Sequence, residues 1–101
     1  MTRSRLPTRR ECDAIAFTHA DVDYIGKVSR FANGSIAEVF LSPGVKSGTA
    51  LAHMVAALSV TASLALQHGC ELETLCDALP RMDDGSPGDP LGALLGLVER
   101  E

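Results

Sequence analysis

The sequence is poor in aromatic residues: among 101 residues it has no Trp, one Tyr and three Phe. A hydrophobic core in this chain must therefore be built from aliphatic side chains and alanine. Aromatic side chains do not alternate with basic ones, so the stacking surfaces of many nucleic-acid-binding proteins are lacking. The chain also lacks a glycine-rich phosphate loop, an HExxH helix, a GxSxG turn and paired CxxC motifs. These absences leave no recognisable catalytic signature.

The cysteines are odd in number, with Cys12, Cys70 and Cys76, and they lack a CxxC pair and a recognisable signal peptide ahead of them. This usage is typical of a reducing compartment, so we expect a cytoplasmic protein. Cys70 is the candidate reactive thiol, because a helix is expected to begin there and a helix N-terminus favours the thiolate. His68, Cys70 and Cys76 are weak metal-ligand candidates that lack the fourth ligand of a zinc site. We therefore expect no metal and no cofactor, with Cys76 packed in the core.

Charge is distributed unevenly along the chain, whose formal net charge is −4. Beyond residue 10, five basic residues stand against thirteen acidic ones, whereas the first ten residues carry Arg3, Arg5, Arg9 and Arg10. We interpret residues 1–11 as a flexible, solvated basic arm; the alternative is an arm that contacts phosphates or an acidic partner. The acidic body argues against nucleic acid as the partner.

The longest uncharged stretch lies between Lys46 and Glu71. At about 100° per residue, its apolar side chains cover nearly the whole circumference, which predicts a long helix buried on several sides. Ser47 or Thr49 can cap the start of this helix, and Gly69 can end it. Residues 50–66 are fewer than the about 20 that a bilayer requires, so we expect no membrane-spanning segment.

Four small side chains, Ala52, Ala56, Ser59 and Ser63, form a stripe along this helix. Such a stripe lets another helix approach closely, so we expect it to bind a second copy of the chain or a larger protein. Glu38 is a further partner-binding candidate. If its strand face is covered, the carboxylate must be paired, and Lys27 or Arg30 on the neighbouring strand could do this; the alternative is an exposed glutamate.

The remaining elements complete the expected fold. Residues 12–19, 22–31 and 35–41 predict three strands, and the Asn33-Gly34 pair predicts a two-residue type I′ turn. Gly26 marks a bulge or a close approach of another backbone. Residues 70–79 and 91–101 predict two short helices, the second capped by Asp89 and started by Pro90. We thus expect one α+β domain over residues 12–101: a three-stranded antiparallel meander followed by a long buried helix and two short helices.

Two segments together resemble the TSCPD domain, which occurs near the C-terminus of adenosylcobalamin-dependent ribonucleotide reductases and as small stand-alone proteins. The first is a hairpin of the form D/N-G-x-I-x-E-I/V-F, here residues 33–40. The second is S-L-x-L-Q-x-G, here residues 63–69. The similarity extends over residues 22–98, most of the chain.

The resemblance implies a non-catalytic accessory or interaction module in the context of deoxynucleotide synthesis. It implies a reductase or a second copy of the chain as partner. The reductase barrel, its thiyl-forming cysteine, its reducing cysteine pair and its cobalamin site do not fit within 101 residues. The name of a ribonucleoside-diphosphate reductase would then reflect ancestry rather than a stand-alone activity. Two alternatives stay open: a small thiol-dependent or redox protein that uses Cys70, and a weak nucleic-acid-associated protein that uses the arginine arm.

Overall fold

Alternating side chains along three consecutive strands build an antiparallel sheet in the order β1-β2-β3. β1 spans Cys12–His19, β2 spans Val22–Arg30 and β3 spans Ile36–Pro43. The computed structural model describes residues 12–45 and 48–99, so the arginine arm lies outside the described residues. The expected α+β architecture is confirmed, because three helices follow the meander.

The two hairpins of the sheet use different turns. Ala20 and Asp21, both with positive φ, join β1 to β2 in a two-residue loop. The second hairpin does not have the expected type I′ turn, because Gly34 has positive φ and Asn33 does not. Instead, Phe31 N–H donates to the Ser35 carbonyl at 2.8 Å around a three-residue loop. The Asn33 side chain accepts hydrogen bonds from Ser35 N–H and Oγ–H, which stabilises this alternative.

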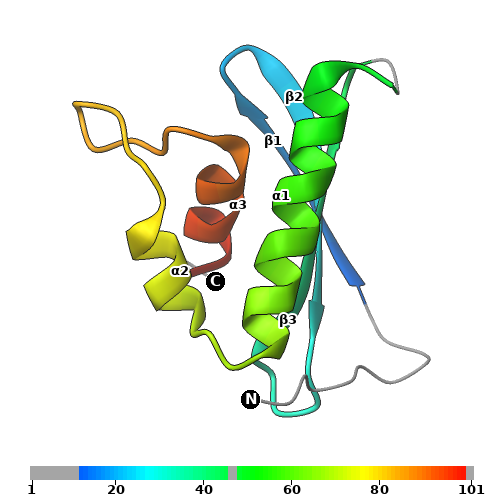
Figure 1. Cartoon of the computed structure of the whole chain (residues 1–101), viewed down its shortest axis with the longest axis vertical. Helices are drawn as coiled ribbons and strands as arrows, with labels where there is room; N and C mark the ends of the chain where they lie inside the picture. Colours follow the sequence, from blue (N-terminus) through cyan, green and yellow to red (C-terminus); the bar gives the residue numbers. More distant parts are fainter. Residues whose placement is uncertain (1–11, 46–47, 100–101) are drawn as a thin grey trace.

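Helix α1, Ala50–Gln67, lies alongside β3 (Figure 1). Thr49 caps its start by accepting a hydrogen bond from Ala52 N–H at 3.2 Å. At its end, Gly69 N–H donates to the Leu66 carbonyl and Cys70 N–H to the Ala65 carbonyl, with Gly69 at φ 97°. These paired bonds form a Schellman motif, so the predicted caps at Thr49 and Gly69 are confirmed.

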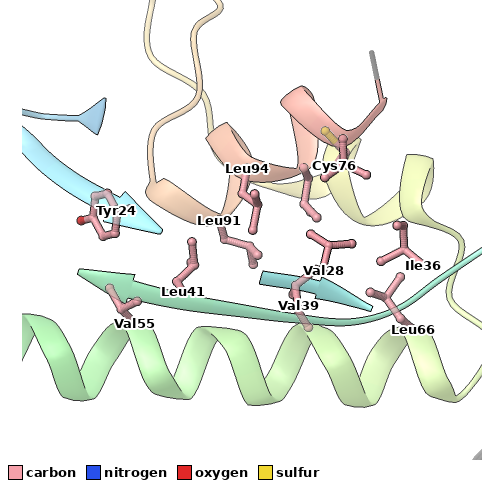
Figure 2. Close-up of a cluster of buried hydrophobic side chains, with 13 residues drawn as sticks. Tyr24, Val28, Ile36, Val39, Leu41, Val55, Leu66, Cys76, Leu91 and Leu94 are labelled. Carbon is pink, nitrogen blue, oxygen red and sulfur yellow. The ribbon is translucent and has the colours of Figure 1, made fainter. Parts of the chain in front are cut away.

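Of the two remaining helices, α3 packs on one face of the sheet and α2 packs against α3. α2 spans Leu72–Ala78 and α3 spans Pro90–Glu99. Asp89 caps α3 as expected, because its Oδ1 accepts a hydrogen bond from Gly92 N–H at 2.8 Å. Figure 2 shows the core between α3, β3 and α1. It consists of aliphatic side chains with one tyrosine and one cysteine: Tyr24, Val28, Ile36, Val39, Leu41, Val55, Ala62, Leu66, Cys76, Leu91, Leu94, Leu95 and Val98.

Gly26 is the point where α3 comes closest to the sheet. A Cβ at this position would lie 2.5 Å from Leu94 Cδ1 and 2.9 Å from Leu94 Cδ2. Leu94 is completely buried, so its methyl groups have little room to move. The close approach expected at Gly26 is present, and a side chain of α3 rather than a backbone makes it.

We predict that Gly26→Ala lowers the free energy of unfolding by about 1–3 kcal/mol, because the added methyl overpacks the Leu94 site. Gly96→Ala is the matched control, since no neighbouring atom lies within 4 Å of its Cβ position in α3. This control should raise stability by about 0.5–1 kcal/mol through helix propensity. Urea denaturation of both variants measures the difference, and equal stabilities would contradict the packing described here.

Candidate interaction surface

Three polar side chains of α1 bind the outer edge of β3. Leu41 N–H donates to Ser59 Oγ at 3.0 Å, and Val39 N–H donates to Ser63 Oγ at 3.0 Å. Ser63 Oγ–H donates back to the Val39 carbonyl at 2.9 Å. Gln67 Nε2–H donates to the Ala37 carbonyl at 3.1 Å. Ser59, Ser63 and Gln67, spaced four residues apart, thus occupy the place of a fourth strand.

This arrangement gives two residues of the small stripe a role inside the chain, whereas partner binding by the stripe remains a prediction. Ser59 and Ser63 are buried and hydrogen-bonded within the chain. Ala52 and Ala56 are only partly buried, so they retain more exposed surface than the two serines. The predicted long buried helix is buried along one side only, because Met54, Val60 and Leu64 are exposed.

α1 also corrects the argument from length against a membrane-spanning helix. It has 18 residues and is apolar enough to cross a membrane by length and composition. In the fold, however, its polar side chains bind β3 and its apolar ones enter the core. We therefore interpret α1 as a core helix with one exposed side.

We predict that Ser63→Ala lowers the free energy of unfolding by about 1–3 kcal/mol, because it leaves the buried N–H and C=O of Val39 without a partner. Thr61→Ala is the control on the same helix. The exposed Thr61 hydroxyl donates only to the Ala57 carbonyl of its own turn, so its loss should change stability by less than about 0.5 kcal/mol. Chemical denaturation compares the two, and a neutral Ser63→Ala would contradict the role assigned to this hydroxyl.

The exposed side of α1 continues onto the uncovered face of the sheet. Phe40 is 45% exposed and Val60 55% exposed, and both line one groove together with Leu64. Ile25, also exposed, lies diagonal to Phe40 across the β2–β3 pairing. We call Ile25, Phe40, Val60 and Leu64 the open surface. An apolar surface that extends over three elements is typical of a binding site.

Two charged residues border the open surface. Glu38 is half-buried and lines the same groove as Phe40 and Val60. Lys27 is exposed and lies directly opposite Phe40 in the strand pairing. Glu38, a partner-binding candidate from the sequence, thus lies beside the open surface. Ile36, two residues earlier on β3, is instead buried in the core. The Arg30 side chain lies 4.0 Å from Asp13 Oδ2 on β1.

The three thiols have different surroundings. Cys12 is exposed at the start of β1, and Cys76 is buried in the core. Burial raises the pKa of the Cys76 thiol, and the nearby Glu99 carboxylate raises it further. Cys70 is partly exposed, immediately precedes the N-cap Glu71, and lines a pocket of about 670 Å³ with Phe31 and Leu72. α2 begins at Leu72, so Cys70 lies just before the helix rather than within its first turn.

The weak metal candidates do not come together. His68 is exposed and its Nδ1 lies 2.9 Å from the Leu64 carbonyl oxygen, whereas Cys76 packs in the core. Within residues 12–45 and 48–99, no three His, Cys, Asp or Glu side chains are grouped as metal ligands.

We predict that Cys76 reacts most slowly of the three thiols with a thiol reagent in the folded protein. Its raised pKa keeps less thiolate at neutral pH, and its burial blocks access. Labelling followed by peptide mass spectrometry measures each site. In denaturant the three rates should converge, and a fast Cys76 in the native state would contradict its place in the core.

Comparison with models of protein families shows which family the chain belongs to. The model of the TSCPD domain matches residues 4–98. The chain belongs to the TSCPD domain family. Comparisons with curated proteins and with solved structures returned no match.

The fold gives physical reasons for the TSCPD motif S-L-x-L-Q-x-G in this chain. Ser63 and Gln67 bind β3, and Gly69 closes the Schellman motif. Leu64 is exposed on the open surface, whereas Leu66 enters the core. The motif therefore contains residues that stabilise the fold and one residue, Leu64, that is exposed on the open surface.

Proposed function

We propose that this TSCPD domain is a non-catalytic interaction module in the context of deoxynucleotide synthesis, which binds a larger cytoplasmic protein such as a ribonucleotide reductase. The open surface carries this proposal. Ile25, Phe40, Val60 and Leu64 expose apolar side chains on one side of a chain with a limited core. Burying them in a complex would contribute favourable hydrophobic free energy.

The open surface also has charges that can orient a partner. Glu38 lies within the groove and Lys27 borders it. Charged groups at the border of an apolar contact favour one docking orientation and exclude mismatched partners. The partner that fits has an apolar ridge that fills the groove lined by Phe40, Val60 and Leu64.

The cysteines support binding rather than nucleotide reduction. Reduction of a ribonucleotide by a reductase needs a cysteine pair that can be oxidised together. Cys12 begins β1, Cys70 precedes α2 and Cys76 lies in the core, and all three are free thiols. Cys76 is buried in the core, so its thiol is not accessible for such a pair.

We predict that Phe40→Glu weakens binding to a purified ribonucleotide reductase from the same cell at least tenfold, because it places a second carboxylate beside Glu38 within the apolar contact. Met82→Glu is the matched control: Met82 is 60% exposed in the loop between α2 and α3, outside the open surface. Isothermal titration calorimetry with the wild-type chain and both variants measures the affinities.

Two results would contradict the proposed function. One is equal affinity of the wild-type chain and Phe40→Glu, which would place the contact elsewhere. The other is deoxynucleotide formation by the purified chain alone, above a control without protein. Removal of residues 1–10 tests the nucleic-acid alternative separately from the proposed function. It deletes four arginines and none of the four residues that define the open surface.

A further inference from the structure

The two edges of the sheet are treated differently by the fold. Ser59, Ser63 and Gln67 satisfy the edge of β3. β1 forms the opposite edge of the sheet, with β2 between it and β3. The two-residue turn makes His19 and Val22 a hydrogen-bonded pair, so the N–H and C=O groups of Ala14, Ala16 and Thr18 point outward. Nothing in the described part of the chain bonds to these outward groups.

β1 has few of the features that protect a free edge strand, since its one charged residue at neutral pH, Asp13, lies near its start. Natural edges are shortened, bulged, or provided with proline or lysine. β1 has eight residues, contains neither Pro nor Lys, and pairs with β2 in continuous register. The irregularity of the sheet lies between Ser29 and Arg30, on the β2–β3 side. β1 is therefore a regular strand with an open edge.

The side chains of β1 leave room for another strand. Ala14 and Ala16 are exposed and small, so they permit close approach on the uncovered face. Ile15 and Phe17 pack against the core on the other face but remain only partly buried. A neighbouring strand would cover the exposed parts of both side chains.

We propose that β1 pairs antiparallel with β1 of a second copy of this chain, about a two-fold axis at Ile15, to form one six-stranded sheet. In this register Ala14 of each copy meets Ala16 of the other, and their outward backbone groups form hydrogen bonds in both directions. Ile15 packs on the Ile15 of the second copy, and Asp13 lies opposite Phe17.

The chemistry of β1 favours a second copy as the occupant. A two-fold interface requires a surface that is complementary to itself, and β1 has this property because its outward residues meet outward residues in antiparallel pairing. Its one carboxylate, Asp13, does not meet another Asp13. The contact is one strand with two apolar side chains, which places its area at the low end of specific interfaces, so we expect dimerisation in the micromolar range. The open surface stays free, so this inference does not depend on the proposed function.

The test measures the mass of the full chain by sedimentation equilibrium over a range of concentrations. We expect the mass to rise with concentration from 10.6 kDa toward twice that value. Ala16→Pro removes an outward N–H and keeps the β1–β2 ladder, so it should keep the circular dichroism spectrum and abolish the dimer. Phe40→Glu, on the open surface, should leave the dimer unchanged.

A disulfide cross-link tests the register of the β1–β1 pairing. It also tests the dimer if the Ala16→Pro variant does not fold. In a chain with Cys12→Ser and Cys70→Ser, Ile15→Cys places two thiols at the axis, where opposed Cβ atoms lie about 4.5–5.5 Å apart. Mild oxidation should then give a disulfide-linked dimer. Thiols introduced by Thr18→Cys lie far from each other in this register and should give none. A single-chain mass at every concentration, a dimer lost with Phe40→Glu but kept with Ala16→Pro, or no Ile15→Cys cross-link would overturn the proposal.

Discussion

The hydrogen bonds between α1 and the edge of β3 determine the arrangement of this domain. Two residues of a strand advance about 6.6 Å, and four residues of a helix advance about 6.0 Å. Side chains at Ser59, Ser63 and Gln67 can therefore follow alternate residues of β3, from Leu41 to Ala37. The match places α1 beside the sheet instead of across one of its faces.

This position of α1 decides how the two faces of the sheet are used. α3 covers one face, and its contact is so close that position 26 has no space for a Cβ. No helix within residues 12–45 and 48–99 covers the other face, so Phe40 and Ile25 are exposed there beside Val60 of α1. The same bonds that protect β3 from edge pairing therefore also leave a sheet face open.

The sequence was sufficient to predict the elements, because each carries a local signal. Thr49 and Gly69 marked the ends of α1, Asp89 marked the start of α3, and the α+β order followed from periodicity. Which part of the chain each side of α1 contacts was not predictable. Helical spacing places Ser59 on the same side as Ala56 but does not show that this side meets β3. The second turn was misassigned because Ser35 bonds to the Asn33 side chain. A sign of this turn was present: R-x-x-N/D-G-S occurs at residues 30–35 and again at 81–86, with the same hydrogen bonds.

The apolar circumference of α1 combines two requirements in one stretch of sequence. Folding requires the side with Val55, Ala62 and Leu66, which enters the core. Met54, Val60 and Leu64 lie outside this core cluster and are exposed. A small domain gains little stability from apolar groups left in water, and exposed apolar groups promote aggregation. Burial of the exposed side of α1 in a complex would explain why these positions are apolar. The composition of the helix is thereby linked to binding.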